Sequence, residues 1–226
     1  FWETLLLPLC AASVGGMTLM SLTNDDRRRG IAFANGQFFL IKRSAYDAVG
    51  GHAAVRDNIV EDVGLMRLLK REGFRTRLYF GRDFASTRMH ATLRQTFNGW
   101  ARIYSGVCDR RPARIVLAML FIVSALAAHP ALLASMVAFA SGHRDAARPW
   151  LYASAAHVFF LTLVLASIYR TSGNPVRYAL AFPLGGSALL AIHAYAVRAC
   201  RTGRIAWRGT SYQSGSSQPA GTAAKR

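Results

Sequence analysis

Acidic residues are almost absent from the second half of this 226-residue chain. Ten of its eleven acids lie at or before Asp109, and only Asp145 follows. Lysine is missing too from position 111 to 224, a stretch that holds ten arginines among long apolar runs. The net charge of +17 and the 52% hydrophobic content exceed those of ordinary soluble domains. This distribution favours membrane helices with arginines at the headgroups. No nucleic-acid-binding module is visible, so we expect no nucleic-acid partner.

Cysteine is scarce, and a signal peptide is not visible. The three cysteines, Cys10, Cys108 and Cys200, lack the spacing of metal ligands or of a disulfide framework. The chain opens at Phe1 on an apolar segment without a basic leader. We therefore expect this sequence to be the C-terminal part of a longer protein.

Residues 1–22 are apolar but interrupted by Glu3, Pro8 and the pair Gly15-Gly16. Their length would allow a bilayer span. A span here would place the downstream acidic motif and the preceding chain on opposite sides of the membrane. We therefore expect helices at the membrane interface or against a catalytic portion.

The next part of the chain predicts an α/β portion. Residues 38–41 and 75–80 have the pattern of strands, and residues 44–50 and 61–72 have the pattern of helices that end at glycines. About 45 residues cannot bury a core alone, so we expect them to complete a sheet begun upstream.

An acidic pair, Glu61-Asp62, starts the second of these helices. Backbone N–H groups at a helix N-terminus favour an ionised carboxylate. Such a carboxylate can accept the proton of an attacking hydroxyl, and Asp62 is the candidate for this role. Acidic pairs at helix starts also serve as simple caps, so the pair alone does not establish catalysis.

Residues 93–107 form an aromatic-apolar helical stripe, typical of either an interfacial helix or a core-facing one. Hydrophobic segments follow at about 114–140, 150–169 and 178–199. Arginines before the first segment and after the last indicate that both ends lie in the cytoplasm. Three full spans would place these ends on opposite sides of the membrane. We predict a cytoplasmic C-terminus, and hence that one of the three segments, the one broken at His129-Pro130, does not cross the membrane fully. The alternative is that the rule for positive charges fails here. From Ser211 onward the composition predicts disorder.

Five further motifs stand in the chain: Asn35-Gly36-Gln37, Gly50-Gly51-His52, Glu61-Asp62-Val63, Trp100 before the membrane helices, and W-R-G-x-x-Y within residues 203–212. Together they resemble the C-terminal half of membrane-bound family 2 glycosyltransferases with a GT-A fold, especially ceramide, hopanoid-associated and carotenoid glycosyltransferases. The resemblance runs from about residue 1 to residue 212.

The resemblance implies inverting sugar transfer from a nucleotide-sugar donor to the hydroxyl of a lipid acceptor. Asp62 takes the position of the family's catalytic base, and Glu61 is its partner in the motif. Gly36 and Gln37 would line the acceptor or sugar pocket. His52 would point into the cleft or serve as a structural histidine.

The family's Q-x-x-R-W motif is only partly present, because Gly99 stands at the arginine position before Trp100. Arg94 or Arg102 would then bind the diphosphate. The Mg²⁺- or Mn²⁺-binding D-x-D motif is absent, and we expect it upstream of this sequence. The adjacent acids Asp25 and Asp26 lack the alternate spacing of that motif. The chain alone is therefore expected to be inactive.

Three regions follow from this interpretation: the C-terminal part of a catalytic domain with interfacial helices (1–110), two or three membrane helices (111–200) and a basic, disordered tail (201–226). We expect a multi-pass protein of the bacterial inner membrane with its catalytic part in the cytoplasm. The alternatives are a processive polysaccharide synthase and a non-catalytic membrane subunit for assembly or lipid binding.

Overall fold

The computed structural model describes residues 1–81, 87–202, 205–207 and 210–212. The chain divides into two compact units. The first consists of Phe1–Ala12 and Val116–Ala194, and the second of Ser13–Ile115 and Tyr195–Arg226.

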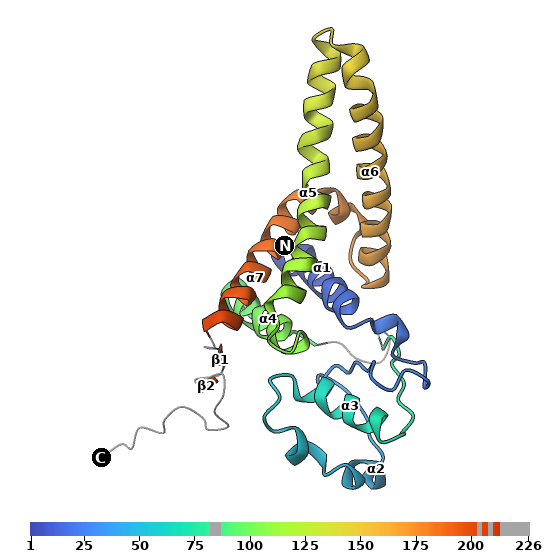
Figure 1. Cartoon of the computed structure of the whole chain (residues 1–226), viewed down its shortest axis with the longest axis vertical. Helices are drawn as coiled ribbons and strands as arrows, with labels where there is room; N and C mark the ends of the chain where they lie inside the picture. The colour runs from blue at the N-terminus through green and yellow to red at the C-terminus, as the bar shows by residue number, and fades with distance from the viewer. Residues whose placement is uncertain (82–86, 203–204, 208–209, 213–226) are drawn as a thin grey trace, which may run out of the picture. The chain divides into compact units, whose positions relative to one another are not determined.

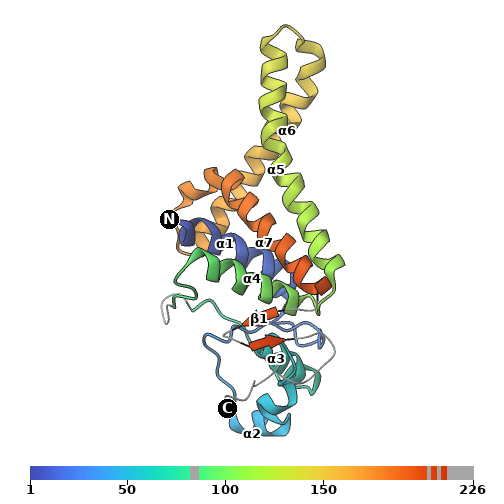
Figure 2. The same cartoon turned by 90° about the vertical axis from the view of Figure 1, so that its left-hand side faces the viewer.

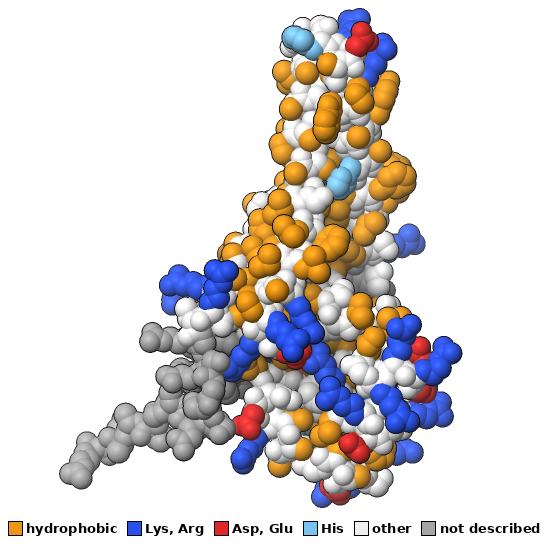
Figure 3. Space-filling model, viewed as in Figure 1, with side chains coloured by type: hydrophobic (Ala, Val, Ile, Leu, Met, Phe, Trp, Pro, Cys, Tyr) orange, Lys and Arg blue, Asp and Glu red, His pale blue; other side chains and the backbone are white. Residues whose placement is uncertain are grey.

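The first unit is built from long apolar helices. Three helical segments among the described residues are long and apolar enough to cross a membrane: Pro112–Ala140, Arg144–Thr171 and Val176–Thr202. They comprise helix α5 (Pro112–Ala140), helix α6 (Arg144–Thr171), and the 3-10 helix η3 (Val176–Ala181) with helix α7 (Phe182–Thr202). Hydrophobic side chains cover α5 and α6, and charged side chains gather at their connection (Figure 3). The chain is a multi-pass membrane protein.

Helices α5 and α6 lie side by side and antiparallel (Figure 1), and the hydroxyls of Ser135 and Ser154 are 3.4 Å apart between them. Helix α5 continues through Pro130 over its 29 residues. The helix is therefore not broken at His129-Pro130. Proline removes one helical hydrogen bond, but leaving the chain unfolded in lipid would expose many more backbone groups.

Helix α1 (Trp2–Met17) packs its first half within the same unit. The hydroxyl of Tyr169 on α6 donates to the carbonyl of Leu5 at 2.6 Å. A Cβ at Gly185 on α7 would lie 2.8 Å from Leu9 Cδ1, so this glycine permits the close approach of α1. The 16 residues of α1 span about 24 Å, less than the hydrocarbon core of a bilayer.

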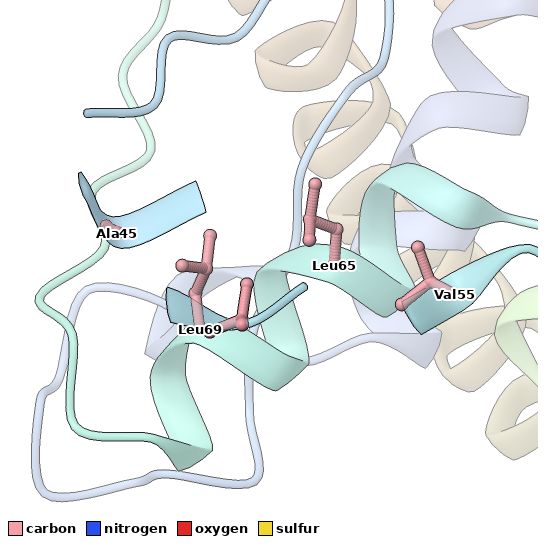
Figure 4. Close-up of a cluster of buried hydrophobic side chains, with 5 residues drawn as sticks. Ala45, Val55, Leu65 and Leu69 are labelled. Atoms are coloured by element: carbon pink, nitrogen blue, oxygen red, sulfur yellow. The ribbon is translucent and has the colours of Figure 1, made fainter. Parts of the chain in front are cut away.

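The second unit contains α2 (Arg43–Ala48), the 3-10 helices η1 (Met20–Leu22) and η2 (Gly51–Val55), α3 (Glu61–Arg71) and α4 (Leu93–Val107). A cluster of buried apolar side chains joins α2, η2 and α3, with Ala45, Val55, Leu65 and Leu69 directed toward one another (Figure 4). The two helices predicted in this region are confirmed. Gly50 and Gly73 have φ of 75° and 88°, the left-handed conformation that ends each helix.

Neither predicted strand forms, and residues 1–81 and 87–202 contain no strand, so the expected α/β portion is not observed there. An extended segment becomes a strand only when a neighbouring strand pairs with it. In the 75–80 segment, the side chain of Asn24 takes the place of a partner. Its amide nitrogen donates to the Leu78 carbonyl at 3.0 Å, and its oxygen accepts from the Leu78 N–H at 2.7 Å.

The described strands lie in the tail, where β1 (Ile205–Trp207) pairs antiparallel with β2 (Thr210–Tyr212) (Figure 2). The pairing places Trp207 opposite Thr210 within the W-R-G-x-x-Y signature. Arg208 and Gly209 of that signature lie outside the described residues, as do residues 213–226 of the predicted disordered tail.

A buried lysine fixes α3 to the loop at residues 23–31. Lys70 is 2% exposed, and its ammonium donates to the carbonyls of Thr23 at 2.6 Å and Ile31 at 2.7 Å. Burial lowers the pKa of Lys70. This contact holds the helix that carries Asp62 in a defined position relative to the preceding loop.

Candidate active site

Asp62 lies in the first turn of α3, and both of its carboxylate oxygens accept hydrogen bonds from backbone amides. The Gly36 N–H donates to Oδ2 at 2.6 Å, and the Val63 N–H donates to Oδ1 at 2.7 Å. The side chain is half-buried, whereas Glu61 is exposed. The carboxylate is therefore held in one orientation by contacts from two separate parts of the chain.

Burial raises the pKa of Asp62 above the ordinary aspartate value of 3.8. The amide bonds from Val63 and Gly36 act in the opposite direction, Glu61 adds a smaller increase, and the Arg102 guanidinium a smaller decrease. Burial prevails. A carboxylate with a raised pKa is a stronger base once it is ionised, which suits proton acceptance.

Gly36 allows its loop to approach Asp62 closely. A Cβ at this position would lie 3.0 Å from Asp62 Oδ2, which is tighter than an ordinary contact. The neighbouring Gln37 is exposed, and both its N–H and its side chain interact with the side chain of Asn35. Gly36 thus contacts the Asp62 carboxylate, whereas Gln37 forms hydrogen bonds with Asn35 inside the loop.

Arg102 of α4 belongs to the same region as Asp62. Its Nη1 donates to the carbonyl of Ile59 at 2.7 Å, just before α3 begins. Gly106, one turn further along α4, is in contact with Val60. Arg94, the other candidate for the diphosphate, is exposed in the first turn of α4, about 12 Å along the helix from Arg102.

Trp100 and His52 occupy different environments. Trp100 is 8% exposed, its ring lies 5.9 Å from that of Tyr104, and its indole N–H has no hydrogen-bond partner among the described residues. His52 is exposed, and its Nδ1 lies 2.8 Å from the hydroxyl of Tyr46, which also accepts from the His52 N–H at 3.0 Å. Both contacts join His52 to Tyr46 of α2.

The sequence analysis missed His90, which is 7% exposed and lies against Gly99. It also did not assign Gln95, whose side chain completes a capping box with Thr92 at the start of α4. The Thr-x-x-Gln pattern was a usable signal for the cap. No comparable pattern marks His90.

The described residues do not fit a divalent metal. They contain no group of three or more His, Cys, Asp or Glu side chains that could hold an ion. Asp25 pairs with Arg27 and Arg28, and Asp26 with Arg75 and Arg77. The Arg27 backbone N–H is the main cause that lowers the pKa of Asp25, and the hydrogen bond from the Arg77 guanidinium is the main cause that lowers the pKa of Asp26.

A protein-family model for glycosyl transferase family 21 matches residues 12–219. The chain belongs to glycosyl transferase family 21. Members of this family are ceramide glucosyltransferase-like and fall in the same clan as the GT-A enzymes of family 2, which confirms the resemblance. Comparisons with curated proteins and with solved structures gave no match. The candidate residues from Gly36 to Arg102 all lie within the part of the chain that matches family 21.

Proposed function

We propose that this family 21 chain supplies the catalytic base of an inverting glycosyltransferase that transfers a sugar from a nucleotide-sugar to the hydroxyl of a membrane lipid. The observation that carries the proposal is the Asp62 carboxylate, held by the N–H groups of Gly36 and Val63. Asp62 lies at the start of α3, where its half-buried carboxylate can accept a proton.

In the proposed reaction, Asp62 accepts the proton of the acceptor hydroxyl as the hydroxyl oxygen attacks the anomeric carbon. The bond from this carbon to the donor diphosphate breaks, and the nucleoside diphosphate leaves with the electron pair. Attack opposite the leaving group inverts the anomeric configuration. Arg102 is close enough to Asp62 to influence its pKa, and its guanidinium would bind the negative charge of the departing diphosphate.

A divalent cation, Mg²⁺ or Mn²⁺, is part of the proposal, and its ligands would lie outside the described residues. When bound, it would neutralise charge on the donor diphosphate. The lipid nature of the acceptor is supported by three candidate membrane spans in the same chain. We place the catalytic part on the cytoplasmic side of the bacterial inner membrane, where nucleotide-sugars are soluble substrates.

The test is Asp62→Asn in the full protein, assayed in membranes with UDP-glucose, UDP-galactose, UDP-N-acetylglucosamine and GDP-mannose as donors and short-chain ceramide and total membrane lipid as acceptors. Loss of the general base should reduce transfer by about 10²- to 10⁴-fold. Glu72→Gln, at the opposite end of α3, is the matched control and should leave transfer unchanged. Retention of more than about a tenth of the wild-type rate by Asp62→Asn would contradict the assignment.

A further inference from the structure

One face of α4 is formed by positions 99, 102 and 106, which recur at helical spacing. Gly106 packs against Val60, and Arg102 donates to the carbonyl of Ile59. Gly99, one turn before Arg102, faces the imidazole of His90, and a Cβ there would overlap with His90 Cε1 and Nε2. The imidazole thus occupies the space that a side chain at position 99 would need.

The chain around His90 is fixed to the start of α4. Gln95 Oε1 accepts from the N–H groups of Ala91 at 2.9 Å and Thr92 at 3.3 Å. In return, Thr92 Oγ1 accepts from the Gln95 N–H at 3.2 Å. These three bonds fix the backbone of the two residues after His90. The His90 ring itself packs against Gly99 of α4.

His90 is also electrostatically linked to Arg102. Burial, followed by the nearby guanidinium of Arg102, lowers the pKa of His90. A neutral imidazole can lie beside a guanidinium without like-charge repulsion and can still offer a hydrogen-bonding nitrogen. The same guanidinium influences Asp62. Arg102 therefore lies within electrostatic range of both His90 and the proposed base.

We propose that His90 is a positioning residue that fills the space over Gly99 and holds the Arg102 guanidinium in place for the donor diphosphate. This inference rests on the proposed function. The imidazole packs on Gly99, the position where the family pattern has an arginine, one helical turn before Arg102. A displaced guanidinium would weaken diphosphate binding more than it would slow proton transfer to Asp62.

The test compares His90→Ala and His90→Gln in the full protein, with whichever nucleotide-sugar of the donor panel supports transfer. His90→Ala should raise the donor KM by about tenfold and change kcat by less than about threefold, because it loosens a binding group and leaves the base intact. His90→Gln retains a polar side chain and should keep KM within about threefold of wild type. Met89→Ala, an exposed neighbour, is the matched control and should have the wild-type KM.

A double variant, His90→Ala with Gly99→Ala, separates positioning from simple packing. The new Cβ occupies part of the vacated space and should bring the unfolding temperature of His90→Ala back toward wild type, while the donor KM remains raised. A wild-type KM in His90→Ala, or a KM restored by the double variant, would overturn the inference and leave the proposed function standing. Failure of the wild-type protein to transfer any of the four sugars would overturn both.

Discussion

The thiol of Cys200 donates a hydrogen bond to the hydroxyl of Ser105, with Sγ and Oγ 3.2 Å apart. Cys200 lies in the last turn of α7, and Ser105 lies in the last turn of α4, a few residues before α5 begins at Pro112. The end of α7 and the start of α5 are therefore neighbours. We infer from this contact that both ends lie on the same side of the membrane and that the chain crosses an even number of times between them.

We predict that α5 and α6 cross the bilayer and that α7 enters and leaves on the cytoplasmic side, which leaves the C-terminus in the cytoplasm. The sequence analysis predicted the same side for the tail but assigned the incomplete crossing to the segment with Pro130. Alkaline phosphatase fused after Ser141, in the connection between α5 and α6, should be active in the periplasm. The same reporter fused after Arg226 should be inactive. Strong activity of the Arg226 fusion would mean three full crossings.

Gly36→Ala should reduce turnover with little effect on stability. The added Cβ would lie 3.0 Å from Asp62 Oδ2 and 3.3 Å from Asp62 Cβ, so the carboxylate or the loop must move by a few tenths of an ångström. We expect kcat to fall by about tenfold or more, because misplaced reacting groups cost rate steeply. Gly30→Ala, whose Cβ would meet nothing within 4 Å, is the control. Equal kcat values for the two variants would argue against a close role of Gly36.

Conservative substitutions can show whether Arg102 or Arg94 binds the donor diphosphate. Arg102→Lys removes the planar fork that reaches Ile59 and should raise the donor KM by about tenfold. Arg94→Lys should have no effect, because this side chain is exposed in the first turn of α4, about 12 Å along the helix from Arg102. A larger KM change for Arg94→Lys than for Arg102→Lys would transfer the diphosphate role to Arg94.

The pH dependence of kcat/KM should show an acid limb set by Asp62. The base acts when ionised, so activity falls as pH decreases through its pKa, and burial places that pKa above 3.8. The Arg102 guanidinium favours the ionised form. Arg102→Gln should therefore move the limb to higher pH in the residual activity. A limb that moves to lower pH would show that another group titrates there.

The sequence predicted those features that depend on local pattern. Helix α3 was predictable because its apolar positions recur at helical spacing and Gly73 ends it in a left-handed conformation. The strands predicted at 38–41 and 75–80 do not form, because a strand depends on a neighbouring strand that pairs with it. The family resemblance pointed to Gly36 and Asp62 as site residues, but the hydrogen bond between them was not predicted. The packing of His90 on Gly99 has no signature in the sequence, since any buried side chain of suitable shape can fill that space.

The thiol of Cys108 has a consequence for labelling experiments on this protein. Burial raises its pKa to about 11, so almost none is present as the reactive thiolate at neutral pH. Cys10 is fully buried as well. Removal of Cys200 alone should then give a background that maleimide reagents leave unlabelled. A single cysteine introduced at Ser141 or at the C-terminus of that variant would report which side of the membrane it faces in intact cells.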